Sequence, residues 1–301
     1  MGCLAMSQRL YATLAEWLSR EAVVLATVLD TRGAVPRHRG AQMLVMATRT
    51  SGSVGGGRLE AKVIAEARDL LDRGERIAQV AIDLTGREGA QGICGGSMQV
   101  VLRRWQGERD AARAGAVAET LASGRTVTLD ADDLGHDSTH TLQPTARLLI
   151  IGAGHCGLAL QRAASLLDYD IHVVDARAEG YDHADFVGAT CHDHLDAIPH
   201  CLDTPRRIRA VLLNRDWHAD LASLEHLAAR PPEFIGMMGS RKRIAEVLAH
   251  LPATWTHLRN HLTAPVGLDL GAETPEEIAV SILAQLIAFS SAAHDPLKNR
   301  T

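Results

Sequence analysis

The segment LLIIGAGHCG, residues 148–157, decides the fold of this 301-residue chain. Its four leading apolar residues predict a buried strand, and the glycines that follow match the Gly-x-Gly-x-x-Gly pattern of dinucleotide-binding folds. In that pattern Gly152 permits a tight turn, Gly154 lets a pyrophosphate approach the backbone, and Gly157 lets the next helix pack closely on the strand. We expect that helix over residues 157–167. A Rossmann-like domain is therefore predicted around this segment.

The sequence beyond this segment continues to alternate between strands and helices. The next predicted strand covers residues 170–175, and Asp175 stands at its end, where a ribose-binding carboxylate is expected. The other predicted elements are strands at 210–213 and 234–238 and helices at 239–251 and 275–290, the last with Thr274 as N-cap and Pro275 at its first position. This alternation predicts a doubly wound parallel sheet. In an alternative interpretation the glycines serve only close packing, and the nucleotide has been lost or replaced.

The residues before this domain predict a second, smaller α/β unit. The expected elements are strands at 21–29, 41–47, 76–84 and 97–104 and helices at 8–20 and 58–74. We assign residues 1–106 to this N-terminal domain and residues 146–301 to the Rossmann-like domain. Between them, residues 107–145 are expected to connect the domains through a helix (109–122), a short strand (126–129) and a polar linker (131–144).

The composition is that of an ordinary globular protein, with 46% hydrophobic residues, 22% charged residues and a net charge of −5. This acidic balance argues against a nucleic-acid partner, because nucleic-acid-binding proteins carry a basic excess. No apolar run reaches the roughly 18–20 residues that cross a bilayer, so we expect no membrane attachment. Five cysteines without a recognisable secretion signal indicate free thiols, and we expect a cytoplasmic protein. The sequence leaves open whether Met1 or Met6 begins the natural chain.

Two glycine-rich segments stand out in the N-terminal domain. The first glycine loop, Gly55-Gly56-Gly57, lies between a strand and a helix, where backbone N–H groups hold anions, and Glu60 is placed to accept hydrogen bonds from a heterocycle. The alternative is a tight turn with a solvated Glu60. The second glycine loop, Gly92–Gly96, contains Cys94, whose flanking glycines predict an exposed thiol that suits molybdenum, copper or sulfur transfer. The alternative is a buried cysteine packed in a loop.

A third segment has the residue types of a metal site but not the spacing. It contains Cys191, His192, Asp193 and His194, followed by His200 and Cys201. This spacing fits no standard zinc pattern, and the segment follows a predicted Rossmann strand in a polar loop. We therefore expect no resident metal ion.

Three cations open the predicted helix that follows Gly236-Met237-Met238-Gly239. Positive charge is unfavourable at a helix N-terminus unless an anion is close, so Ser240, Arg241, Lys242 and Arg243 suggest a phosphate or carboxylate site. A solvated basic helix face is the alternative. The two glycines of residues 265–272, just before the final helix, suggest a shaped binding loop.

Together these segments resemble the XdhC/CoxI family of molybdenum-cofactor maturation proteins, which serve xanthine dehydrogenase and related molybdenum hydroxylases. The resemblance covers nearly the whole chain. It rests on GSVGGGRLE (52–60), GICGG (92–96), LLIIGAGHCG (148–157), VVDAR (173–177), GMMGSRKR (236–243) and PVGLDLGAETPEEIAVSI (265–282). Each motif alone is weak, but all six in this order and spacing are specific.

The resemblance implies a maturation chaperone rather than an enzyme, with a Rossmann-like C-terminal domain and an N-terminal domain of the family's own type. It implies binding of the molybdenum cofactor, as molybdopterin or its cytosine dinucleotide form, beside an unproven nucleotide in the Rossmann site. It also implies two partners: an apo-molybdoenzyme of the xanthine dehydrogenase family and a cysteine desulfurase that assists exchange of an oxo ligand for sulfur. A homodimer is a further expectation for a chain that opens and closes around a cofactor.

The family's motifs also imply which residues contact the cofactor. Cys94 is expected to make the sulfur or molybdenum contact. The cofactor-binding candidates are Gly55, Gly56, Gly57, Glu60, Gly95, Gly96, Gly152, Gly154, His155, Gly157, Asp175, Ser240 and Arg241. In two places the chain departs from relatives: Ile93 replaces the first of two adjacent cysteines, and Gly55 and Arg58 stand where others have Ser and Cys. A sulfur role therefore falls on Cys94 alone.

Two other classes of function remain as alternatives. The first is an NAD-dependent oxidoreductase that uses the Rossmann domain for hydride transfer, with Asp175 favouring NAD over NADP because a carboxylate repels a 2′-phosphate. Against it, the sequence shows no acid–base pair at an obvious spacing. The second is a protein-interaction scaffold in which both glycine loops are structural.

Overall fold

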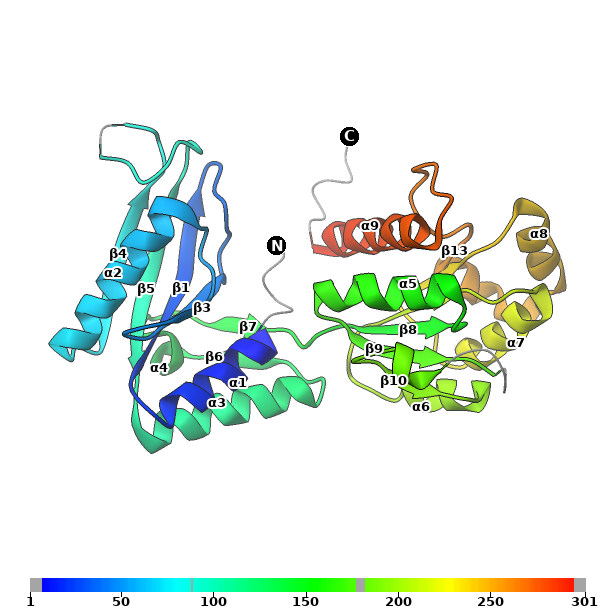
Figure 1. Ribbon diagram of the computed structural model, residues 1–301, viewed down its shortest axis with the longest axis horizontal. Helices are drawn as coiled ribbons and strands as arrows, with labels where there is room; N and C mark the ends of the chain where they lie inside the picture. Colours follow the sequence, from blue (N-terminus) through cyan, green and yellow to red (C-terminus); the bar gives the residue numbers. More distant parts are fainter. Residues whose placement is uncertain (1–6, 88, 177–181, 295–301) are drawn as a thin grey trace. The chain divides into compact units, whose positions relative to one another are not determined.

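The computed structural model describes residues 7–87, 89–176 and 182–294. The chain divides into two compact units, an N-terminal unit over residues 1–145 and a C-terminal unit over residues 146–301 (Figure 1). Both candidate start residues, Met1 and Met6, lie outside the described residues, as does Arg177 of the VVDAR motif. Each unit has its own sheet and its own hydrophobic core.

The N-terminal unit is built on an antiparallel sheet in the order β3-β2-β1-β5-β4. Its strands are β1 (Val23–Arg32), β2 (Gln42–Val45), β3 (Thr50–Gly52), β4 (Ile77–Asp83) and β5 (Ser97–Trp105). Helix α2 (Gly57–Arg73) covers one face, and helices α1 (Ser7–Leu18) and α3 (Gly107–Ala122) cover the other. Alternate residues of β1 serve the two faces: Val24 packs with α2, whereas Val23 and Leu25 pack with α1 and α3.

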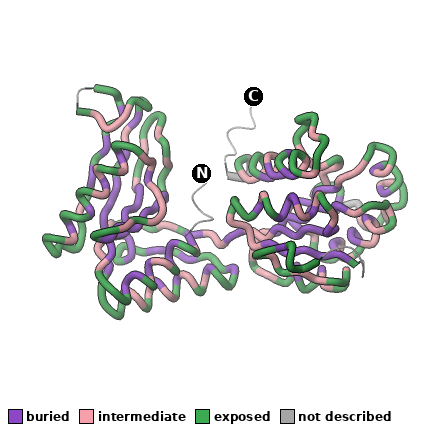
Figure 2. The backbone as a smooth tube through the Cα atoms, in the orientation of Figure 1, coloured by how far each residue is buried: buried purple, intermediate pink, exposed green. Residues whose placement is uncertain are grey.

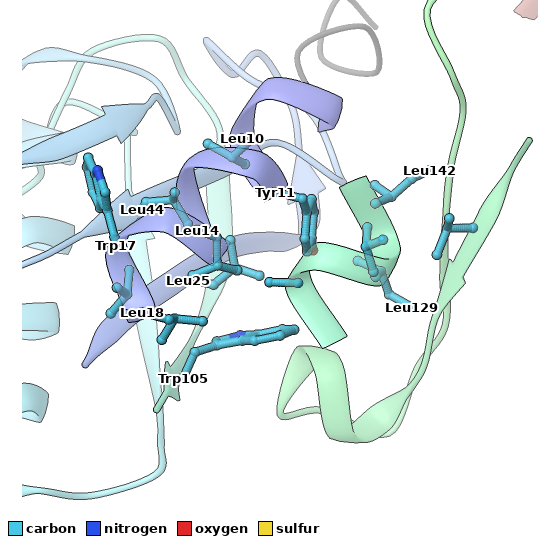
Figure 3. Close-up of a cluster of buried hydrophobic side chains, with 14 of the residues drawn as sticks. Leu10, Tyr11, Leu14, Trp17, Leu18, Leu25, Leu44, Trp105, Leu129 and Leu142 are labelled. Carbon is cyan, nitrogen blue, oxygen red and sulfur yellow. The ribbon is translucent and has the colours of Figure 1, made fainter. Parts of the chain in front are cut away.

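The prediction that residues 131–144 form a polar interdomain linker is wrong. After α3 the chain forms β6 (Val127–Leu129), α4 (Ala131–Leu134) and β7 (His140–Leu142). Leu129, Leu134 and Leu142 are buried in the same core as α1 and Trp105, and Figure 3 shows Leu129 and Leu142 in this cluster. The buried Asp133 forms an ion pair with Arg113 of α3 at 2.6 Å, which fixes α4. Single apolar residues that are separated by turns show no helical or strand period. The mostly polar composition of residues 131–144 therefore did not indicate that their leucines are buried.

The C-terminal unit has a parallel six-stranded sheet in the order β10-β9-β8-β11-β12-β13, the strand order of dinucleotide-binding Rossmann folds. Its strands are β8 (Arg147–Ile151), β9 (Asp170–Val174), β10 (Thr190–His192), β11 (Ile208–Leu212), β12 (Phe234–Met237) and β13 (Leu262–Thr263). Its helices are α5 (His155–Ala164), α6 (Ile198–Leu202), α7 (Trp217–Ala228), α8 (Arg241–His250) and α9 (Pro275–His294). The predicted doubly wound parallel sheet is therefore confirmed.

Helices cover both faces of this sheet. Helices α5 and α9 pack on one face, and α6, α7 and α8 pack on the other (Figure 1). The central strands are buried along their length (Figure 2), as expected for parallel strands that lie between two helical layers. Among the described residues, no helix has the length and apolarity to cross a membrane.

The start of α9 follows its sequence signals closely. The Thr274 hydroxyl accepts a hydrogen bond from the Glu277 N–H at 3.2 Å, and the Glu277 carboxylate accepts one from the Thr274 N–H at 3.1 Å. This reciprocal capping box satisfies two of the helix's first N–H groups. The predicted N-cap is therefore confirmed. The shorter elements β10, α6 and β13 were not predicted, because a few residues do not establish a hydrophobic period. The 12-residue helix α7 was not predicted either.

Candidate functional site

The Rossmann loop, Gly152–Gly157, lies at the carboxyl end of β8, beside β11. This is the point where the strand order reverses and where such sheets bind ligands. A Cβ atom on Gly152 would stand 2.7 Å from the carbonyl of Leu213, and one on Gly157 would stand 2.1 Å from the Gly152 oxygen. The close helix–strand packing predicted for Gly157 is therefore confirmed, and the turn predicted at Gly152 agrees with its φ of 112°. A Cβ on Gly154 meets open space, and ligand binding there stays a prediction.

Helix α5 begins at this loop with an exposed His155 at its first position and Gly154 as N-cap. In the described part of the chain, the N–H groups of His155, Cys156 and Gly157 have no acceptor, which makes this helix start suitable for an anion. The thiol of Cys156 is partly buried, and that burial, together with the charge of Glu276, raises its pKa. Cys156 is therefore held as a neutral thiol at neutral pH.

Asp175 lies at the end of β9, as predicted, but its carboxylate is buried and bonded. The residue is 4% exposed, and its Oδ2 accepts a hydrogen bond from the Ala153 N–H at 2.7 Å. This contact orients the Rossmann loop. A role in binding a ribose hydroxyl stays a prediction, and the bond to Ala153 already uses one of the two carboxylate oxygens.

The three cations at the start of α8, Arg241, Lys242 and Arg243, differ in their contacts and exposure. Arg243 donates hydrogen bonds to Asp220 of α7, with its Nε at 2.8 Å, and to the Asn214 carbonyl at 2.7 Å. Arg243 thus ties α8 to α7 and to the end of β11. Arg241 and Lys242 are exposed, and Ser240 caps the helix by accepting from the Arg243 N–H at 3.3 Å. Only Arg241 and Lys242 of the three cations therefore face solvent at this helix start.

The loop at residues 265–272 is fastened to α9. Gly267 has a φ of 103°, and its N–H donates to the Gln285 side chain at 2.8 Å. The Ser281 hydroxyl donates to the Leu268 carbonyl at 2.6 Å. These contacts give Gly267 a packing role, whereas a Cβ on Gly271 meets open space. The predicted use of the loop in binding stays a prediction.

The first glycine loop of the N-terminal unit precedes α2. Gly55, Gly56 and Gly57 have φ values of 145°, 73° and 59°, conformations that favour glycine. The Glu60 carboxylate accepts from the Gly56 N–H at 3.1 Å and from the Ser53 hydroxyl at 2.6 Å. Glu60 therefore folds back onto the loop and fixes its shape. The N–H groups of Gly57, Arg58 and Leu59 have no acceptor among the described residues.

The second glycine loop carries Cys94 on the surface between β4 and β5. Cys94 is exposed, as predicted, and Ile93 beside it is 89% exposed. Gly96 is needed for packing, because a Cβ there would stand 2.4 Å from the carbonyl oxygens of Arg32 and Ala34. Gly95 has a φ of 86° and faces open space. The loop is thus packed against the sheet at Gly96 and presents an accessible thiol at Cys94.

Both glycine loops rest on one segment, residues 33–36, which connects β1 to β2. Gly33 lies against the backbone of Gly95 and Gly96, and Pro36 lies against Gly55. The two loops come from parts of the sequence that are far apart, and the structure brings them together through this segment. Candidates Gly55–Gly57, Glu60 and Cys94 therefore belong to one region of the N-terminal unit.

The structure brings together three side chains, one of which the sequence did not indicate. His172 on β9, His192 on β10 and Cys201 on α6 approach one another within 4.8 Å. Burial raises the pKa of the Cys201 thiol to about 11, and burial followed by the charge of His172 lowers the pKa of His192. His192 and Cys201 were in the segment considered for a metal, but His172 was not. His172 is identified by the parallel pairing of β9 with β10, which places it on the same face of the sheet as His192.

The fold and these loops define a class of protein with a Rossmann-like unit and a separate unit that presents a thiol beside a glycine loop. A family model described as the XdhC Rossmann domain matches residues 148–286, and another, the XdhC and CoxI family, matches residues 17–82. The chain belongs to the XdhC/CoxI family.

Three similar proteins cover most of the chain. "Uncharacterized protein YqeB" of Escherichia coli is 30% identical over 278 residues, which are 89% of this chain and 44% of that protein. "Molybdenum cofactor insertion chaperone PaoD" of Escherichia coli is 25% identical over 293 residues, 89% of this chain and 84% of that protein. A crystal structure of a xanthine dehydrogenase from Bacillus halodurans matches with a TM-score of 0.81 and 25% identity, over 95% of this chain and 96% of that chain. The chain thus spans less than half the length of YqeB.

Proposed function

We propose that this chain binds the molybdenum cofactor and takes part in the maturation of a molybdoenzyme of the xanthine dehydrogenase type. The observation that carries the proposal is the region of the N-terminal unit where exposed Cys94 and the first glycine loop rest on residues 33–36. Support also comes from the likeness to PaoD, which is named as a cofactor insertion chaperone.

The residues of this region suit a phosphorylated pterin that carries molybdenum. The N–H groups at the start of α2 and the open space around Gly56 and Gly57 suit an anionic phosphate. The Cys94 thiol suits a soft metal or a sulfur ligand. The cofactor, when bound, supplies the molybdenum centre that the target enzyme needs. The chain's part is to hold the phosphate, with Glu60 keeping the loop in shape, and to present the thiol.

The finer proposal is that Cys94 acts during sulfuration of the cofactor with a cysteine desulfurase. A partner protein must reach the thiol, and Cys94 is exposed on its loop. Ile93, which is 89% exposed, adds apolar surface of the kind that protein partners cover. Cys94 is the one cysteine of the second glycine loop, so the proposed role in sulfuration is assigned to this single thiol.

The oxidoreductase alternative is favoured by one observation, the Rossmann strand order of the C-terminal unit. The buried bond between Asp175 and the Ala153 N–H weighs against it, because that carboxylate is the usual ribose ligand. A titration with NADH and a panel of small alcohols and acids separates the two functions, since a chaperone shows no turnover.

The direct test is binding of purified molybdenum cofactor to the metal-free protein. Gly57→Asp places a carboxylate in the proposed phosphate cradle, and Gly57→Asn is its control, because both side chains tolerate the left-handed conformation. We expect the aspartate to weaken binding about tenfold or more and the asparagine to change it much less. For the thiol, Cys94→Ala should reduce delivery of sulfurated cofactor, whereas Cys156→Ser should not. Absence of binding, or equal binding by both Gly57 variants, would refute the cradle.

A further inference from the structure

We propose that the C-terminal unit contains a zinc-type metal site formed by His172, His192 and Cys201. His172 Nδ1 lies 3.1 Å from His192 Nε2. The Cys201 sulfur lies 3.7 Å from His172 Nδ1 and 3.4 Å from His192 Nε2. Three atoms that commonly bind transition metals therefore form a small triangle. The site is independent of the first and second glycine loops and of the proposed cofactor role.

The size of this triangle matches a tetrahedral ion. Zinc binds imidazole nitrogen at about 2.0–2.1 Å and thiolate sulfur at about 2.3 Å, which places ligand atoms about 3.4 Å apart for two nitrogens and about 3.6 Å apart for nitrogen and sulfur. The observed separations, 3.1, 3.4 and 3.7 Å, lie around these values. The two imidazole rings are nearly parallel, with centroids 5.4 Å apart, so the two nitrogens face each other in this structure. Binding an ion therefore requires both rings to turn toward the centre of the triangle.

The fold itself brings the ligands together. Strands β9 and β10 are parallel, with Val174 opposite His192 and His172 two residues earlier on β9. Because side chains alternate along a strand, His172 and His192 share one face of the sheet. Cys201, which is fully buried on α6, packs on that same face with the residues around β11. Two of the three ligands are thus set by strand register.

The surroundings of His172 are those of a metal ligand. Its Nε2, the nitrogen that faces away from the triangle, lies 3.6 Å from Asp170 Oδ1. Asp170 is itself held by Arg147 at 2.8 Å and Arg206 at 3.2 Å. Metal-binding histidines usually direct their second ring nitrogen to a carboxylate, which fixes the ring and its tautomer. Asp170 is placed to do this for His172.

The ligand types select the class of metal. Two imidazoles and one thiolate suit a borderline or soft transition-metal ion and are poor ligands for magnesium or calcium. Zinc is the probe of choice, and cobalt is its spectroscopic substitute. Among the described residues no fourth ligand joins the three, and a water or a small ligand would complete four-coordination. An ion here would fasten the three-residue edge strand β10 to α6.

The experiment uses the whole 301-residue chain, stripped with a chelator, reloaded with zinc or cobalt and freed of excess metal. We expect one ion per chain and, with cobalt, a thiolate charge-transfer band together with the intense visible bands of four-coordination. Cys201→Ala and His192→Asn should each lose the retained ion and the band. Cys191→Ser is the matched control, because Cys191 also lies on β10 but packs with the opposite core, and it should keep both.

Two results would overturn the proposal. One is wild-type protein that retains no more metal than Cys201→Ala, in which case the triangle is a hydrogen-bonded group without an ion. The other is retention that survives both Cys201→Ala and His192→Asn, which would place the metal elsewhere among the chain's 15 histidines. If Cys201→Ala fails to fold, His192→Asn alone decides the outcome, because His192 is only partly buried.

Discussion

Replacing Arg243 with methionine should distinguish this structural cation from the two exposed cations beside it, Arg241 and Lys242. The guanidinium of Arg243 is 18% exposed and pairs with Asp220, whose side chain is fully buried. Asn214 donates to the other oxygen of Asp220 at 3.1 Å. Methionine keeps most of the arginine stem but leaves the buried carboxylate without its charged partner.

The expected cost follows from that burial. Breaking a buried ion pair by removing one partner typically costs about 3–5 kcal/mol, and the Asn214 carbonyl loses a donor as well. Burial already raises the pKa of Asp220, against the hydrogen bonds and charge of Arg243. Without Arg243 this pKa rises further, so the carboxyl takes up a proton more readily in the folded protein. The penalty should therefore be full at pH 7.5 and smaller as the pH falls toward about 4, the carboxyl's unfolded value.

Urea unfolding at pH 7.5 and pH 5, with peptide-resolved hydrogen exchange, measures this penalty. Loss of protection should concentrate in α7 and α8, with α2 of the N-terminal unit as the internal reference. Lys242→Met is the control, because an exposed side chain of the same helix should change stability by no more than about 0.5 kcal/mol. A cost below about 1 kcal/mol for Arg243→Met, or one equal to that of Lys242→Met, would refute the assigned role.

Packing and charge elsewhere in the two units give three further tests. Gly157→Ala should lower the thermal midpoint, since its Cβ would stand 2.1 Å from a carbonyl oxygen, whereas Gly154→Ala meets open space; equal shifts would contradict this reasoning. Leu129→Ala should cost about 2–5 kcal/mol in urea unfolding, and a cost near zero would restore the linker interpretation. Burial opposes ionisation of Asp110, yet the hydrogen bonds from Arg103 lower its pKa overall. Its ionised form therefore stabilises the fold above pH about 4, and this stabilisation is lost as the pH falls. Asp110→Asn should make the free energy of unfolding depend less on pH in this acid range. An unchanged dependence would count against the Arg103–Asp110 ion pair.

The strands and helices with a clear hydrophobic period could be predicted from the sequence. The Rossmann-like unit could be predicted from the strand at 148–151, from the three glycines of the Rossmann loop and from Asp175. Each of these has a fixed position in that fold. The cap of α9 was equally clear, since Thr274 and Glu277 act on neighbouring backbone. Local interactions of this kind leave a local pattern.

Contacts between residues that are far apart in the sequence left no such local pattern. Nothing near Cys94 in the sequence indicates that its loop rests on residues 33–36 together with the first glycine loop. His172 joins His192 and Cys201 only because β9 and β10 pair in one particular register. A cluster sought by sequence spacing alone therefore included Cys191 and His194 and omitted His172. Register, rather than residue type, carries that information.

Two acids that the sequence assigned to ligand binding accept hydrogen bonds from backbone N–H groups, and they do so in the same way in both units. Glu60 accepts from the Gly56 N–H, and Asp175 accepts from the Ala153 N–H. Each carboxylate thus takes one donor of a glycine loop and fixes the loop before a helix begins. The donors that remain are those of the first helical turn, in α2 and in α5. Because a carboxylate beside these donors repels an anion, a bound phosphate gains most at the helix start and least at the residue whose N–H the acid already holds.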